Sequence, residues 1–304
     1  MGFPDLLKQI REIYFERYAF PDWVLRVKKT MYNKYAKTCI VLYNSDDNES
    51  TTLENVKLLM ENREPTNIAM GRLYDSNKLN KILGYKQGVY GDFEHSVNVS
   101  VFVKTPMQVG SGFIEVNVLN VIAPAFDNQQ QPDFKYFNYS KNEEDLIKRF
   151  TLIFQMILHT MIIEKFKKLY LCGFGLGAFN NNAQHYTEGL RRVFGGKQLP
   201  FEIFFMDYSP RIFGEQQLYK YCKYVKANYH HLNTEIESTE DLQDSLFINA
   251  WDPWSFIGNG NAGDNSWDGA FGRFTMMSIL AIPQLNKYIQ YVDLATGDYS
   301  SESE

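Results

Sequence analysis

The chain has few of the features that mark a secreted or membrane-spanning protein. Only three of its 304 residues are cysteines, Cys39, Cys172 and Cys222. An odd number of widely spaced cysteines argues against a disulfide framework and favours free thiols in a reducing, cytosol-like compartment. No run of about 18 apolar residues is present, so we expect no membrane span. The stretch 1–9 also lacks the apolar run of a signal peptide.

Basic charge is also scarce. The 31 lysines and arginines are outnumbered by 36 acidic residues, which gives a net charge of -5 and a pI of about 5.7. Proteins that bind a nucleic-acid backbone are usually basic, so nucleic acid is not an expected partner. Hydrophobic residues make up 44% of the chain and aromatic residues 15%. This composition allows a sizeable core and supplies rings that can stack on a flat ligand.

Strand-like and helix-like patterns alternate along the chain, which indicates an α/β fold with three layers and a mixed or largely parallel sheet. We expect a helical extension over 1–36, one main domain over 37–297 and a disordered polar tail over 298–304. Apolar runs predict strands at 38–43, 97–104, 113–123, 169–172, 201–206 and 246–250, and helical spacing predicts helices at 51–62, 143–168, 183–194, 214–230 and 274–280.

The stretch 246–273 combines glycines with acids in a way that a structural loop seldom needs. Glycines let the backbone approach a ligand closely. Carboxylates that lie close together repel one another unless a ligand, metal or partner is present. The stretch therefore predicts a functional site. Its glycines are Gly258, Gly260, Gly263 and Gly269, and its acids are Asp252, Asp264 and Asp268.

A second glycine-rich loop, 173–181, lies between a predicted strand and a predicted helix. Backbone N–H groups at such a turn, together with the helix N-terminus behind it, can bind an anion. The spacing matches neither a P-loop nor the dinucleotide fingerprint. From these residues alone, phosphate binding and a tight structural turn both remain open. Asn180 is expected to cap the helix that follows.

The two loops and one strand together resemble a known family. Residues 171–181 resemble the diphosphate-binding loop of poly(ADP-ribose) glycohydrolases and their microbial relatives, a branch of the macrodomain superfamily. Residues 118–125 resemble the strand of those proteins that ends in Ala-Pro. The stretch 248–273 resembles the macrodomain series Val-Asn-Ala-Ala-Asn, Gly-Gly-Gly-Val, Asp-Gly-Ala-Ile-His-Arg, whose loop holds the distal ribose. That loop precedes the diphosphate loop in ordinary macrodomains and follows it here, which we interpret as a circular permutation.

The resemblance implies a three-layer α/β/α macrodomain-like fold and assigns the ligand-binding residues. The diphosphate would lie against the first loop, and Asn249 would tie the ribose loop to its strand. Phe179 would cover a ribose or pack in the core. The implied ligand-binding residues are Gly173, Gly175, Leu176, Gly177, Ala178 and Phe179 at the diphosphate, and Asn249, Gly258, Asn259, Gly260 and Asn261 at the distal ribose.

The same resemblance implies catalytic acids. Asp268 matches the family's catalytic position, Asp252 would hydrogen-bond the ribose hydroxyls, and Asp264 could be a base or a metal ligand. A carboxylate there can stabilise an oxocarbenium-like state or activate water. Asp252 can also be interpreted as an Asp-Pro turn residue. The sequence departs from the family at Asp252, Asn259 and Asn261 and by an insertion at 262–267.

The leading hypothesis is an ADP-ribosyl hydrolase that needs no metal or cofactor. The paired glutamates of the polymer-cleaving enzymes are absent, so cleavage of ribose–ribose bonds is not expected. The acidic loop resembles that of bacterial effector macrodomains that remove ADP-ribose from a modified protein such as ubiquitin. We expect a monomer in the cytoplasm, or in a host's cytoplasm if the chain is secreted. Two alternatives remain, a reader that binds ADP-ribose without cleaving it and a metal-dependent nucleotide-sugar phosphohydrolase.

Overall fold

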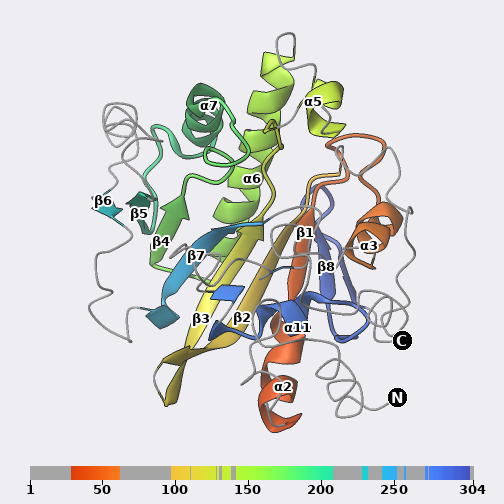
Figure 1. Cartoon of the computed structure of the whole chain (residues 1–304), viewed down its shortest axis with the longest axis vertical. Helices are drawn as coiled ribbons and strands as arrows, with labels where there is room; N and C mark the ends of the chain where they lie inside the picture. Colours follow the sequence, from red (N-terminus) through yellow and green to blue (C-terminus); the bar gives the residue numbers. More distant parts are fainter. Residues whose placement is uncertain are drawn as a thin grey trace.

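The computed structural model describes residues 29–61, 97–109, 111–127, 129, 132–137, 142–207, 228–231, 242–251, 257, 271–272 and 274–301. Within this part of the chain, nine strands form one sheet in the order β6-β5-β4-β7-β3-β2-β1-β8-β9 (Figure 1). The strands are β1 (Ile40–Tyr43), β2 (Ser100–Val109), β3 (Gly112–Val121), β4 (Lys168–Cys172), β5 (Glu202–Asp207), β6 (Asn228–His231), β7 (Ser245–Ala250), β8 (Gln290–Asp293) and β9 (Tyr299–Ser301).

The sheet is mixed, as the sequence predicted, but most of its strands run in one direction. β2 pairs antiparallel with β1 and β3, and β9 pairs antiparallel with β8. All the other neighbouring pairs are parallel. The carboxyl ends of the remaining strands therefore lie along one edge, where open α/β sheets bind their ligands.

Helices cover both faces of the sheet, which confirms the prediction of three layers. α6 and α7 pack on one face, in a core with Phe102, Leu169 and Ile248. On the other face, α2, α3 and α11 pack with Val41 and Val101. The helices are α2 (Lys29–Tyr35), α3 (Leu53–Glu61), α5 (Pro132–Phe137), α6 (Glu143–Ile163), α7 (Ala183–Phe194) and α11 (Met277–Ala281), and a short 3₁₀ helix spans Ala36–Thr38.

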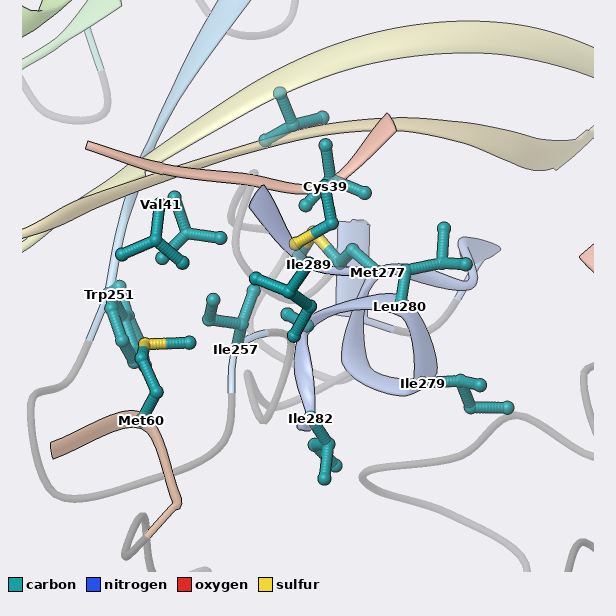
Figure 2. Packing of buried hydrophobic residues seen from close by; sticks show 14 of the residues in the cluster. Cys39, Val41, Met60, Trp251, Ile257, Met277, Ile279, Leu280, Ile282 and Ile289 are labelled. Atoms are coloured by element: carbon teal, nitrogen blue, oxygen red, sulfur yellow. The ribbon is translucent and has the colours of Figure 1, made fainter. Parts of the chain in front are cut away.

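The core on the second face joins segments from both ends of the chain. Figure 2 shows Cys39 beside Met277 and Ile289, and Val41 near Trp251. Burial raises the pKa of the Cys39 thiol, so it is an inert apolar side chain here. Neither Cys39 nor Cys172 forms a disulfide, as the sequence predicted. Cys222 lies outside the described residues.

α6 is the central helix of the first face. Three acids in its first turn suit the positive end of the helix dipole. Lys165 then takes a positive φ of 59° and ends the helix before the predicted residue 168. Among the described helices, α6 has the length and hydropathy that could span a membrane, but 56% of its apolar window is buried inside the protein. Its packing against the sheet is that of a core helix.

The structure corrects two predictions about secondary structure. Residues 298–304 were expected to be a disordered tail, but Tyr299–Ser301 form β9 against β8. Gly297, at a φ of 74°, closes the connecting turn by donating its N–H to the Asp293 carbonyl at 2.8 Å. Asn228–His231 form strand β6 at a position where the predicted helix 214–230 should end. In both places an existing edge strand supplies backbone partners, which composition does not reveal.

Truncation of a ring in the first core should destabilise the protein strongly. Phe154 is fully buried on α6 and contacts the rings of Phe174, Tyr186 and Phe194. Phe154→Ala should lower the free energy of unfolding by about 3–5 kcal/mol because it leaves a cavity. Urea denaturation would measure the loss. Ile162→Ala on the same helix is the control, since Ile162 is 52% exposed and its truncation should change stability by less than about 0.5 kcal/mol.

Candidate ligand-binding site

The chain leaves two neighbouring strands, β4 and β7, toward opposite faces of the sheet. After β4, Phe174 and Leu176 enter the core beneath α6 and α7. After β7, Trp251 and Ile257 enter the core on the other face. β4 and β7 pair in parallel, so both connections start at the same edge. In open α/β sheets, ligands bind in the crevice where neighbouring connections diverge in this way, so we take the carboxyl ends of β4 and β7, here named the β4–β7 crevice, as the candidate site.

The loop between β4 and α7 is a compact double turn. Leu176 donates its N–H to the Gly173 carbonyl at 3.0 Å, and Asn180 donates to the Gly177 carbonyl at 3.0 Å. Gly175 has a φ of 78°, and a Cβ added to it would lie 2.4 Å from the Cβ of Ala123. Only glycine therefore fits at position 175 without displacing its surroundings.

This loop is fastened to the segment that follows β3. Phe126 donates its N–H to the Phe179 carbonyl at 2.9 Å. The side-chain amide of Asn181 donates to the Pro124 carbonyl at 2.6 Å and to the Gly175 carbonyl at 2.9 Å. Because β7 lies between β4 and β3 in the sheet, these bonds bridge the end of β7. The loop and the Ala-Pro segment, residues 122–126 after β3, thus form one hydrogen-bonded wall at the β4–β7 crevice.

Asn181 is the residue of this wall that the sequence did not single out as a ligand-site residue. Its side chain is 8% exposed, and its Oδ1 has no hydrogen-bond partner within the described part of the chain. The run of three asparagines, 180–182, was the available signal. The expected helix cap, Asn180, is also corrected. Asn182 caps α7 by accepting the Gln184 N–H at 2.9 Å, because Asn180 has a positive φ of 54° and completes the preceding turn.

The loop residues that the resemblance assigned to ligand binding differ in exposure, and therefore in which of their atoms can contact a ligand. Gly177 and Ala178 are exposed at the tip of the loop. Leu176 is buried, so only its backbone can face a ligand. Phe179 is partly buried and packs against the first core. Its position agrees with the packing role that was one of its two predicted roles. Gly173 and Gly175 are partly exposed.

Of the residues predicted at the distal ribose, Asn249 lies within the described structure. It is on β7, is 1% exposed and donates its amide N–H to Oδ1 of Asn120 at 2.9 Å. Asn120 lies on β3, so this bond joins two strands, and the role of Asn249 in tying the loop to its strand stays a prediction. The other predicted residues of this loop, Asp252, Gly258, Asn259, Gly260, Asn261, Asp264 and Asp268, lie outside the described residues. No cluster of metal-binding side chains occurs in the part of the chain that the structure describes.

The buried carboxyl group of Asp133 is hydrogen-bonded to the Ala-Pro segment. Asp133, in the first turn of α5, accepts the Ala125 N–H at 2.8 Å. Burial raises the pKa of this carboxyl to about 6, although the charge of Arg149 and the Ala125 hydrogen bond oppose the rise. Arg149 is itself buried on α6, with its guanidinium 5.4 Å from the centre of the Phe137 ring. No sequence pattern indicated this group, because Ala125, Asp133 and Arg149 come from three separate segments.

Only the comparison with solved structures relates the chain to known proteins. No protein-family model matches it, and the search of curated proteins finds no match. Five chains of solved structures do match. One is the crystal structure of poly(ADP-ribose) glycohydrolase from Deinococcus radiodurans in complex with ADP-ribose, with 15% sequence identity and a TM-score of 0.33. The match covers 72% of this chain and 92% of the other. A TM-score this low carries no argument about function.

The raised pKa of Asp133 predicts a pH-dependent stability. Its native pKa is about 6 and its usual value 3.8, so between these values the native state binds a proton that the unfolded state releases. The contribution of Asp133 to stability therefore rises as the pH falls through this window and is unfavourable above it. Asp133→Asn removes the titration.

Urea unfolding of wild type and Asp133→Asn at pH 4.5 and pH 7.5 would measure this effect. The wild type should gain stability relative to the variant at the lower pH, by an amount on the order of 2 kcal/mol. A difference between the two proteins that is constant across this range would contradict the assignment.

Proposed function

We propose that this chain is an ADP-ribosyl hydrolase, which binds ADP-ribose at the β4–β7 crevice and releases it from a modified protein side chain. One observation carries the proposal. The loop that resembles a diphosphate-binding loop follows β4, and the stretch that resembles a distal-ribose loop follows β7. These two strands are parallel neighbours in the sheet, so their carboxyl ends lie at the same edge. The chain continues on opposite faces of the sheet after the two strands. The two stretches, which are far apart in the sequence, thus begin on the two sides of the β4–β7 crevice.

The diphosphate would be bound by backbone rather than by basic side chains. Gly177 and Ala178 are exposed, and no hydrogen bond within the described structure uses their N–H groups. The N-terminus of α7 lies directly behind this loop and favours an anion. Fixed N–H groups suit a diphosphate because they need no reorganisation when the ligand arrives.

Hydrolysis would take place at the distal ribose, on the β7 side of the crevice. Water would add to the anomeric carbon as the bond to the protein side chain breaks, and the leaving group would take up a proton. The developing positive charge on the ribose calls for a nearby carboxylate. Asp268 and Asp264 are the proposed catalytic acids, and Asp252 is proposed to hold the ribose hydroxyls. The order of the two loops is proposed to be a circular permutation of the macrodomain arrangement.

The acidic loop suggests the first substrate to test. Its resemblance to bacterial effector macrodomains supports ADP-ribosylated ubiquitin as the modified protein. We propose that the chain acts as a monomer in the cytoplasm, that of a host if the protein is secreted.

The catalytic assignment predicts that binding and release can be separated. Asp268→Ala should abolish release of ADP-ribose from ADP-ribosylated ubiquitin and retain ADP-ribose binding, because the diphosphate wall is untouched. Calorimetry would measure binding, and chromatography would measure release. Unchanged turnover would exclude Asp268 as the catalytic acid. A wild type that binds ADP-ribose but releases none would instead be a reader, and activity that EDTA abolishes would indicate the metal-dependent alternative.

The diphosphate wall can be tested with two matched glycine substitutions. Gly175→Ala and Gly196→Ala each place a side chain at a positive φ, which costs about 1 kcal/mol. A Cβ at position 175 would clash with Ala123, whereas nothing lies within 4 Å of one at position 196. Gly175→Ala should therefore weaken ADP-ribose binding at least tenfold in calorimetry, and Gly196→Ala should leave it unchanged. Equal affinities of the two variants would place the diphosphate elsewhere.

A further inference from the structure

Two buried carboxamides lie side by side near the carboxyl ends of β3 and β7. Asn120 is fully buried and Asn249 is 1% exposed, and the two residues are direct partners in the parallel register of these strands. Both lie on the face of the sheet toward which the chain continues after β7. Buried amides on a sheet face that is otherwise packed with apolar side chains need hydrogen-bond partners to offset their desolvation.

Their hydrogen bonds form a directed chain across three strands. The amide nitrogen of Asn249 donates to Oδ1 of Asn120 at 2.9 Å, and the amide nitrogen of Asn120 donates to the Val101 carbonyl at 3.2 Å. A backbone carbonyl can only accept, so Val101 fixes which way the Asn120 amide is turned. The Oδ1 of Asn120 therefore faces Asn249, and Asn249 donates to it from its amide nitrogen. The orientation of both amides follows from one backbone carbonyl on β2.

The oxygen of Asn249 is consequently turned away from Asn120. Two residues further on, Trp251 donates its N–H to the Val121 carbonyl at 2.9 Å. The chain that leaves β7 is therefore held to β3 at two successive points, the amide pair and the Trp251 N–H. Asp252 follows directly.

We propose that Asn120 is a positioning residue of the hydrolase site. It sets the amide orientation of Asn249 and, through it, the point from which the acid-bearing loop departs. This inference rests on the proposed function, because it assigns Asn120 a role in that reaction. Displacement of a reacting group by about 1 Å can lower a rate by about a hundredfold. The diphosphate wall is untouched, so loss of an anchor three residues before Asp252 should affect the rate more than ADP-ribose affinity.

Asn120→Ala tests this role, and Asn117→Ala is the matched control. Asn117 is on the same strand, is equally buried and donates to the carbonyls of Gln243 and Ser245, both at 3.0 Å, near the start of β7. Both substitutions remove buried hydrogen bonds and should lower thermal stability. Asn120→Ala should reduce kcat for ADP-ribose release at least tenfold, with KM and ADP-ribose affinity within about threefold of wild type. Asn117→Ala should leave kcat unchanged at a temperature where both variants are folded.

Asn120→Asp provides a conservative rescue. A protonated aspartic acid has the shape of asparagine, can donate its O–H to the Val101 carbonyl and can accept from Asn249. The ionised form would face the Val101 carbonyl with a negative charge. The kcat of Asn120→Asp relative to wild type should therefore rise as the pH falls, whereas the relative kcat of Asn120→Ala should not change with pH.

The outcomes separate this inference from the proposed function. If wild type releases ADP-ribose but Asn120→Ala and Asn117→Ala have equal kcat values, Asn120 is purely structural and the inference is wrong. A parallel loss of affinity and kcat in Asn120→Ala would also contradict it, because it would indicate collapse of the whole site. If wild type neither binds nor releases ADP-ribose, the proposed function fails instead.

Discussion

The parallel pairing of β7 between β4 and β3 is the constraint on which the proposed site depends. This pairing places three chain segments at one edge of the sheet, the glycine-rich loop after β4, the Ala-Pro segment after β3 and the chain that leaves β7. The close contact of Gly175 with Ala123 and the hydrogen bonds of Asn181 then lock two of these segments together. The third is anchored by the amide pair of Asn120 and Asn249. Without β7 in the middle, these three segments would not start at neighbouring positions on one edge of the sheet.

Buried polar groups specify this edge of the sheet more than apolar packing does. The two cores fill the faces of the sheet and would tolerate many apolar arrangements. Asn120, Asn181 and Asp133 each have a defined set of backbone carbonyl or N–H partners, which few alternative arrangements would satisfy. A buried polar group that loses its partner is costly, so such groups fix the positions of the segments they join. The region that needs the most accurate geometry is therefore held by hydrogen bonds rather than by shape alone.

Much of the fold could be predicted from local patterns. The strands at β1, β3, β4, β5 and β7 and the helices α6 and α7 lie close to their predicted positions, because apolar periodicity over five or more residues reflects burial on one or two faces. β8, which lies inside the sheet between β1 and β9, was not predicted. β6 and β9 were not predicted either. Both are short edge strands, formed where a neighbouring strand offers backbone partners, and neither Asn228–His231 nor Tyr299–Ser301 has a distinctive apolar pattern. The glycine-rich loop was predicted as an element of the site, but the side chains that support it were not.

The sequence alone determined the class of fold, the two glycine-bearing stretches and their resemblance to ADP-ribose-binding loops. These are local properties, since periodicity and motif spacing can be read over a few turns or strands. The tertiary structure decided the strand order, the divergence of the chain after β4 and β7, and the partners of Asn120, Asn181 and Asp133. Each of these depends on contacts between residues that are far apart in the chain, such as Asn120 and Asn249. Local propensity contains no information about which distant backbone carbonyl or amide a buried side chain will meet.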